Sequence, residues 1–339
     1  MSVRLMSRIG IFHLALILAV SLMGCSKKEN KPQEVQPTAP SAINAPTPTA
    51  CGTPDATPQN VQGVKTEMRN VMFHLTEKAS ANLRTLSGEL WPTNKNEMVV
   101  FDDKSSFEVR AQNGTVAISP DALADILNNY VFAKPDAPLK DLTVEIDKDS
   151  KLIIKGKLHS KGDIPFGTKG TPSVDPDGRI RVRTEKITAL KLPVKGLMGL
   201  FGVELANVVN TSKIPGIDTD KNDLLMDLGT LLPPPHIRGK VSGVRVERNA
   251  IVTTFGDGGK TSTPTKEPSS FMAFTGSRVR FGRLVMEPTD LTVLDLDPKG
   301  SLDWDQDHYK EQLQAGYSKI TPEFGLHAYA KDYAKLKEK

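Results

Sequence analysis

Alternating apolar and polar residues dominate the chain after residue 63, and this period of two indicates half-buried β-strands. Val71–Leu75 alternates in this way, and Leu83–Trp91 predicts a second strand that ends at a proline. Phe107–Val116 predicts a strand, or a hairpin that turns at Asn113-Gly114, a pair that favours a type I′ turn. The pattern therefore predicts antiparallel strands joined by short turns.

Two segments have the spacing of helices instead. Ser119 is a favourable N-cap before Pro120, and the helix predicted there extends to about Phe132. A second helix is predicted from about Pro193; it is apolar on almost every side, and its glycines cost about 1 kcal/mol each relative to alanine. The large apolar residues of these helices include Leu123, Ile126, Leu127 and Tyr130 in the first and Leu197, Met198, Phe201 and Leu205 in the second.

Two further hairpins follow the same alternation. One covers Leu142–Leu158 with a turn at Lys148–Ser150, and the other covers Ile237–Phe255 with a turn at Glu247–Asn249. Between them, Asp175–Gly178 combines residues that are typical of a tight turn. Hairpins and two helices in one chain predict the fold class α+β.

The start of the chain has the three parts of an export signal, residues 1–24. Arg4 and Arg8 supply positive charge, and Ile9–Met23 is an apolar stretch too short for a typical transmembrane helix. Leu22-Met23-Gly24-Cys25 resembles the bacterial lipobox, which implies cleavage before Cys25 and attachment of lipid to that cysteine. The serine that follows favours the outer membrane, facing the periplasm, in a bacterium with two membranes. An ordinary secretory signal and an uncleaved anchor are the alternatives.

Composition divides the rest of the chain. Residues 25–64 are rich in proline, threonine and lysine without an apolar period, so we expect an extended tether. The tether contains Cys51, which we interpret as a spare thiol; a second lipid site and an intermolecular bridge are the alternatives. Residues 65–256 carry the patterns of a β-rich domain, residues 257–270 form a predicted linker, and residues 271–339 form a predicted C-terminal extension.

The layout of hairpins and an apolar helix resembles the TULIP (tubular lipid-binding) superfamily, and especially its bacterial periplasmic phospholipid-binding branch. The likeness is carried by Asp177–Gly202, a strand followed by the apolar helix, and by Leu231–Gly256, where three prolines lead into a hairpin. The resemblance implies long twisted hairpins curved around one or two helices, with a groove for acyl chains between helix and sheet. The eight apolar helix residues named above would line that groove; plain core packing is the alternative for each of them.

Three arginines stand at alternate positions of one predicted strand, so their side chains share a face. These are Arg179, Arg181 and Arg183, and we consider them candidates for contact with anionic lipid head groups. A solvated strand face is the alternative. The net charge of the whole chain, +4, is too small to indicate a nucleic-acid partner.

The sequence contains no recognisable catalytic or metal-binding motif. None of the six histidines is paired at metal-ligand spacing, and no nucleophile elbow, phosphate loop or dinucleotide fingerprint occurs. Asp303–Asp307 opens with the spacing of a calcium loop but lacks the glycine and glutamate that complete one, so we expect a solvated acidic loop. We therefore expect no enzymatic activity, no cofactor and no metal.

Two function hypotheses from different classes remain. The first is a lipoprotein, held at the membrane by lipidated Cys25, that binds or carries a phospholipid or acyl chain at the cell envelope. The second is a structural or assembly lipoprotein that docks an envelope protein through residues 271–339. A hydrolase is a third hypothesis, and it would require a polar cluster in a cleft.

Overall fold

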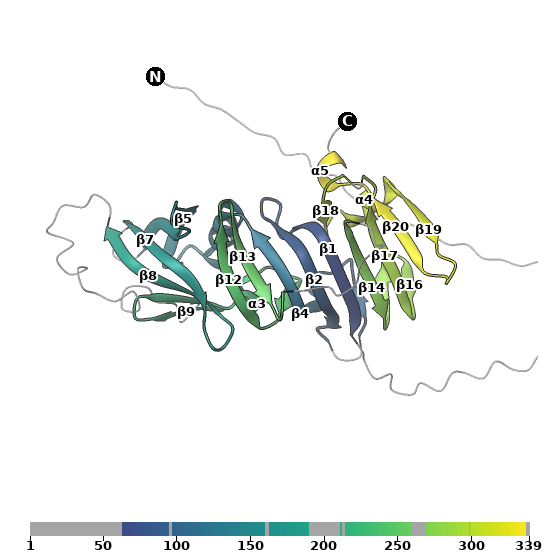
Figure 1. Ribbon diagram of the computed structural model, residues 1–339, viewed down its shortest axis with the longest axis horizontal. Coiled ribbons are helices and arrows are strands. Elements are labelled where there is room, and N and C mark those ends of the chain that lie inside the picture. The colour runs from purple at the N-terminus through teal and green to yellow at the C-terminus, as the bar shows by residue number, and fades with distance from the viewer. Residues whose placement is uncertain are drawn as a thin grey trace, which may run out of the picture. The chain divides into compact units, whose positions relative to one another are not determined.

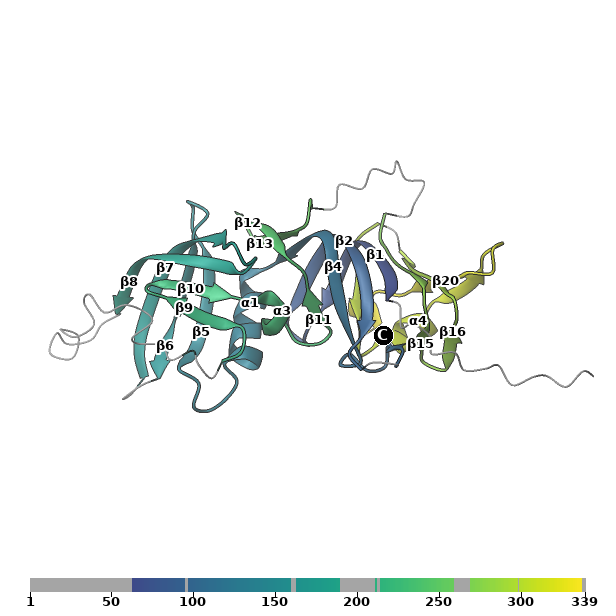
Figure 2. The ribbon, with the colours of Figure 1, turned by 90° about the horizontal axis from the view of Figure 1, so that it is seen from below.

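The computed structural model describes residues 63–94, 97–159, 163–189, 211, 214–258, 269–297 and 299–336. Over these ranges the strands form three sheets, with eleven, six and three strands. Figures 1 and 2 show the long strands of the large sheet lying side by side, and the six-stranded sheet formed by the middle of the chain. The described part of the chain is therefore predominantly β-structure.

The large sheet has the strand order β12-β13-β4-β2-β1-β14-β17-β20-β19. Two short strands add to this path in parallel, one beside β4 and one beside β1. The strands are β1 (Val64–His74), β2 (Ser80–Pro92), β4 (Phe107–Ile118), β11 (His236–Arg238), β12 (Val241–Glu247), β13 (Ala250–Phe255), β14 (Phe271–Gly276), β17 (Thr289–Asp295), β18 (Leu302–Asp305), β19 (Tyr317–Ile320) and β20 (Leu326–Ala330).

The two smaller sheets combine pairs of neighbouring strands with pairs between distant ones, such as β15 with β3. The six-stranded sheet has the order β5-β6-β7-β8-β10-β9, and the three-stranded sheet has the order β16-β15-β3. Their strands are β3 (Val99–Val100), β5 (Leu139–Ile146), β6 (Leu152–His159), β7 (Asp163–Val174), β8 (Ile180–Ala189), β9 (Ile217–Asp220), β10 (Asp223–Met226), β15 (Val279–Phe281) and β16 (Leu284–Met286).

The predicted hairpins at 142–158 and 237–255 are confirmed. Strand β5 pairs with β6, and β12 pairs with β13, both antiparallel. At the first turn, the Asp147 carboxylate accepts hydrogen bonds from the backbone N–H groups of Asp149 and Lys151, and Ser150 takes a left-handed φ of 57°. Short polar side chains that bond to their own turn explain why this hairpin is visible in the sequence.

Of the two alternatives for residues 107–116, the strand is confirmed and the hairpin turn at Asn113-Gly114 is wrong, because β4 continues through this pair, with a register shift beside it, and pairs with β2 on both sides. Glycine serves a different purpose there. A Cβ at Gly114 would lie 2.7 Å from the carbonyl oxygen of Thr85, so only glycine lets β2 and β4 approach this closely. A glycine inside a strand marks such a close approach as readily as a turn.

The fold class α+β, with hairpins curved around helices, is also wrong. The helices of the described residues are only four to seven residues long: α1 (Pro120–Ile126), the π-helical turn η1 (Leu127–Val131), α3 (Leu228–Leu231), α4 (Tyr309–Gln314) and α5 (Tyr333–Leu336). The first predicted helix corresponds to α1 and η1 together, whereas the one predicted from Pro193 lies outside the described residues. Sheets, rather than helices, supply most of the core.

Most strands after residue 270 belong to the large sheet, namely β14, β17, β18, β19 and β20, so this part of the chain is not an appendage to that sheet. Strand β14 pairs antiparallel with the first half of β1, and β18 pairs parallel with its second half. The change of partner occurs at Asn70, which has a left-handed φ of 50° and whose amide donates to the Ser270 hydroxyl and the Gly300 carbonyl. Pairings between residues 200 positions apart leave no local pattern, which explains why the sequence suggested a separate extension.

The buried side chains form two clusters. One lies against the large sheet, and the other lies between the six-stranded sheet and the α1–η1 segment. Ile118, Val131 and Leu228 pack against both clusters and so join them. The place where the two clusters meet is the most distinctive feature of the interior.

Candidate functional site

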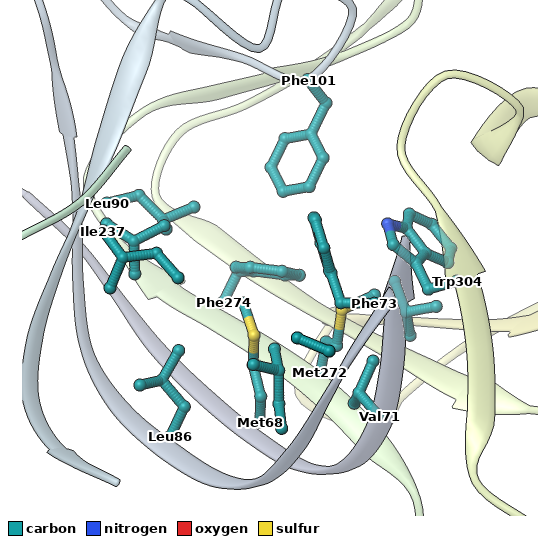
Figure 3. Close-up of a cluster of buried hydrophobic side chains, with 14 of the residues drawn as sticks. Met68, Val71, Phe73, Leu86, Leu90, Phe101, Ile237, Met272, Phe274 and Trp304 are labelled. Atoms are coloured by element: carbon teal, nitrogen blue, oxygen red, sulfur yellow. The ribbon is translucent and has the colours of Figure 1, made fainter. Parts of the chain in front are cut away.

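An apolar cavity of about 100 Å³ lies where the two clusters meet. Its lining comes from both larger sheets and from the α1–η1 segment, and it is apolar except for Thr253 and Gln306. In Figure 3, Met68, Leu86, Leu90, Met272 and Phe274 converge beside Ile237 and Phe101. A wall that is almost wholly apolar offers few hydrogen bonds to water and suits an apolar occupant.

Aromatic rings form one end of the cavity. Phe101 lies just after β3, and its ring centroid is 5.1 Å from that of Phe274 and 4.5 Å from that of Phe281. The carbonyl of Phe101 accepts a hydrogen bond of 2.7 Å from the Gln306 amide, whose oxygen accepts in turn from Trp304 Nε1. Both ends of the Gln306 amide are therefore hydrogen-bonded, as a buried polar group requires.

The α1–η1 segment forms a second wall. Ser119 caps α1 by accepting a hydrogen bond from the N–H of Ala122, as its sequence position predicts. Asn128 ties the segment to β5: its amide oxygen accepts from Leu142 N–H at 2.8 Å, and its amide nitrogen donates to the carbonyls of Leu142 and Ala124. This clamp fixes the face of the segment that borders the cavity.

Three of the helix residues that the sequence analysis nominated line this cavity: Leu123, Ile126 and Leu127. The fourth, Tyr130, is 41 % exposed and lines a neighbouring pocket instead. The nominees of the second helix, Leu197, Met198, Phe201 and Leu205, lie outside the described residues, as do Cys25 and Cys51. The residues missed by the sequence analysis are the inward members of the strands, whose alternation marked them as buried but not as cavity lining.

The neighbouring pocket has a volume of about 630 Å³ and a mixed character. It shares Val131 and Leu231 with the apolar cavity, so the side chains of these two residues separate the two spaces. Its polar groups include Tyr130, Lys134, Asp136, His159, Thr230 and His236. A polar pocket beside an apolar cavity offers separate environments to the two ends of an amphiphile.

The two histidines of the polar pocket are held in place. His236 Nδ1 lies 3.0 Å from the carbonyl oxygen of Leu232, which can only accept, so Nδ1 carries a proton. His159 Nδ1 lies 2.7 Å from the Asp163 carboxylate. Asp163 has a pKa below its ordinary value, chiefly because of this hydrogen bond. His236 therefore directs its other ring nitrogen away from the bond that fixes it.

The three candidate head-group arginines already face carboxylates. Arg179 Nε lies 2.8 Å from Asp175, and Arg181 Nη1 lies 2.8 Å from Asp223. Arg183 is more open, at 73 % side-chain exposure, with Asp223 3.9 Å from its Nε. An anionic head group at this face would have to compete with these ion pairs, so the arginine strand is a weaker candidate than the polar pocket.

The stretch 303–307 is strand and tight turn, and the expectation of a solvated acidic loop is wrong. Trp304 is fully buried, and Asp305 is 5 % exposed. The Asp305 carboxylate accepts hydrogen bonds from the backbone N–H groups of Asp307 and His308, and the backbone N–H of Asp305 donates to the Gln312 side chain. His74 Nε2 lies 2.6 Å from the Asp303 carboxylate. Burial disfavours the Asp303 carboxylate, but hydrogen bonds from His74 and from backbone keep its pKa below the usual value. Asp303 and Asp305 therefore hold this turn through hydrogen bonds within the fold.

Asp295, at the end of β17, is a buried acid of a different kind. One carboxylate oxygen accepts a hydrogen bond from the backbone N–H of Asp297, and the other has no partner in the described structure. Burial, reinforced by the charge of Asp332, raises the pKa of Asp295 to about 6.

Among the residues that the structure describes, no cluster of three or more histidine, cysteine or acidic side chains has the geometry of a metal site. Within the same ranges, no helix has the length and apolar character needed to cross a bilayer. No family model, curated protein or solved structure matches the chain. The resemblance to the tubular lipid-binding superfamily therefore stays a prediction.

Proposed function

We propose that the protein binds an amphiphile with an acyl chain, as a lipoprotein anchored at the cell envelope through Cys25. The observation that carries this proposal is the apolar cavity that shares two lining residues, Val131 and Leu231, with a neighbouring pocket that contains charged and polar groups. The tail of the ligand would occupy the cavity, and its head group would occupy the pocket. Each end of such a molecule finds the environment it prefers.

The size of the cavity bears on how the ligand enters. A cavity of about 150 Å³ holds one benzene molecule, so 100 Å³ accepts only a short part of an acyl chain. The partition beside the pocket consists of side chains, which can change rotamer without breaking strand pairing. Met68, Met226 and Met272 also line the cavity, and unbranched methionine side chains adapt readily to an occupant. Binding would widen the cavity from the pocket side.

The charges of the pocket favour a phospholipid head group. Lys134 can donate to phosphate oxygens, whereas Asp136 supplies a carboxylate for an amine. Because Lys134 and Asp136 balance each other, a zwitterionic phosphoethanolamine matches the pocket better than a purely anionic group. A lysophospholipid, with one chain, fits the small cavity better than a lipid with two.

The test compares the lipids that co-purify with the full chain and with Val131→Trp, which fills the partition between the spaces. Lipids extracted into organic solvent are separated from the covalent acyl chains, which stay with the protein. Val244→Trp adds the same bulk at a partly buried valine that does not line the cavity. We expect a stoichiometric lipid with the wild type and with Val244→Trp, and its loss with Val131→Trp. Equal lipid in all three proteins, or none in the wild type, would contradict the proposal.

The docking hypothesis was based on residues 271–339, because the layout of a tubular lipid-binding domain does not require them. Strand β14 lies next to β1, and Met272 and Phe274 line the cavity. This segment therefore has a role within the fold, and the lipid-binding proposal accounts for more of the described residues.

A further inference from the structure

The hairpin of β19 and β20 exposes large apolar side chains at its tip. Phe324 is 90 % exposed and Ile320 is 75 % exposed, the highest values among the large hydrophobic residues described. All four residues of β19 are exposed, and this strand forms one edge of the large sheet. The described residues cover little of these two side chains, so their retention needs another explanation.

The turn that carries Phe324 is well defined and strained. The N–H of Thr321 donates to the Gly325 carbonyl at 2.8 Å, and the N–H of Phe324 donates to the Thr321 carbonyl at 3.0 Å. Phe324 has a φ of 67°, in the left-handed region that bulky residues avoid. Glycine or asparagine would form this turn with less strain. The phenylalanine therefore costs stability and packs little on the described residues, which points to a contact outside this part of the fold.

The sheet register shows at which end of the strands this tip lies. Leu326, at the start of β20, pairs with Leu291 of β17, and Leu291 pairs with Phe274 of β14. Gly276 ends β14 opposite Val64, the first residue of β1. The tip therefore lies at the same end of the strands as Val64, where the chain from Cys25 enters the sheet. It is displaced from Val64 by three strand spacings, or about 15 Å. Figure 1 shows the loop between β19 and β20 and the start of β1 at the same end of their strands.

We propose that the tip of the β19–β20 hairpin inserts Phe324 and Ile320 into the interface of the bilayer that holds the lipid anchor. The proposal rests on anchoring through Cys25 and not on the cavity. Lys319 Nζ lies 5.3 Å and 5.6 Å from the rings of Tyr317 and Tyr329, and these rings stack at 4.3 Å. Tyrosine and lysine behind an apolar tip match the order of groups at a membrane interface.

The tip also carries Glu323, whose charge limits how deeply the tip can insert and weakens any attraction to anionic lipid. Opposite charges at Lys319 and Glu323 leave the tip without a strong net attraction to anionic lipid. Insertion should therefore be shallow and should occur in uncharged phosphatidylcholine bilayers. Two apolar side chains alone bind a bilayer weakly, and attachment of the chain to the same membrane supplies the local concentration that makes the contact persistent.

The experiment uses the full lipidated chain with Cys51→Ser and Phe324→Cys, labelled at position 324 with an environment-sensitive dye, in phosphatidylcholine vesicles. A matched label at Asp149→Cys, in the exposed turn between β5 and β6, is the control. We expect the emission of the label at 324 to shift to shorter wavelength and to be quenched by a nitroxide on the lipid chains, while the control label remains aqueous.

Three outcomes would overturn the proposal. Aqueous emission at 324 in protein that floats with the vesicles would show that the anchor works and the tip does not insert. Failure to float would remove the anchor on which the proposal rests. A shift at 324 that appears in detergent without vesicles and grows with protein concentration would show that a second copy covers the hairpin. Lipid extraction reports on the cavity separately, so failure of lipid binding and failure of tip insertion are distinguishable.

Discussion

Leu127→Ala tests whether the interior cavity is a binding site. Leu127 is 4 % exposed and borders the cavity from η1. Truncating a buried leucine to alanine costs about 2–5 kcal/mol, and the cost grows by about 24 cal/mol for each Å³ of cavity that remains. Because the new space joins an existing cavity of about 100 Å³, its walls cannot collapse fully. We expect a loss of about 3–4 kcal/mol in the free energy of unfolding, measured by urea denaturation.

The informative step is rescue of this variant by a small apolar ligand. A ligand present at 100 times its dissociation constant stabilises the folded state by about 2.7 kcal/mol. Benzene and 1-octanol should therefore restore much of the stability of Leu127→Ala and should stabilise the wild type less. Leu142→Ala is the matched control, because Leu142 is 3 % exposed in the same cluster and does not line the cavity. Equal responses of the two variants to the ligands would refute the reasoning.

Three further predictions concern stability. Asp295 has a folded-state pKa raised to about 6, so its protonated form stabilises the fold below about pH 4, and this contribution is lost as the pH rises through 6. In urea titrations, the free energy of unfolding of Asp295→Asn relative to that of the wild type should therefore rise by about 2–3 kcal/mol between pH 4 and pH 8. A parallel pH dependence of the two proteins would contradict this. Asn128→Ala removes the hydrogen bonds to Leu142 of β5 and should lower the free energy of unfolding by about 1–3 kcal/mol. Asn128→Asp should lower it further, because an anionic oxygen would then face the Leu142 carbonyl. If Asn128→Ala were the less stable variant in thermal unfolding, Asn128 would not hold the segment to β5 in this way. Phe324→Gly should leave stability unchanged or raise it by up to about 1 kcal/mol, since relief of about 1–2 kcal/mol of left-handed strain offsets the extra chain entropy of glycine; a clear loss would show that Phe324 packs within the fold.

The sequence predicted the elements whose causes are local. The helix from Pro120 was predictable because its cap, its proline and its apolar stripe are adjacent in the chain. The hairpin of β5 and β6 was predictable because Asp147 bonds to its own turn. Gly114 was misinterpreted because a glycine that admits a neighbouring strand has the same local signature as a glycine in a turn. Strand β2 was itself predicted, but its pairing with β4 beside Gly114 is visible only once the sheet is assembled.

The candidate site was predictable only in part, for a related reason. The apolar stripe of the first helix identified Leu123, Ile126 and Leu127, because a helix shows its buried face in its period. The remaining walls come from strands whose inward residues look the same whether they line a cavity or fill a core. The ion pairs of Arg181 were not predictable, because Asp220 and Asp223 approach through the sheet order β8-β10-β9, whereas Arg179 pairs with Asp175, four residues before it.

The C-terminal strands link the cavity to the edge of the sheet that we assign to the membrane. Strand β14 contributes Met272 and Phe274 to the cavity wall, and the chain after β18 contributes Gln306, which holds the loop of Phe101. Removal of residues 271–339 would therefore open the cavity, strip both partners from one edge of β1 and expose its backbone. Such a truncation would abolish lipid binding and any partner contact together, and so could not separate them. Point variants can, because Val131 lies at the partition inside and Phe324 lies at the tip outside, and neither packs on the other's surroundings.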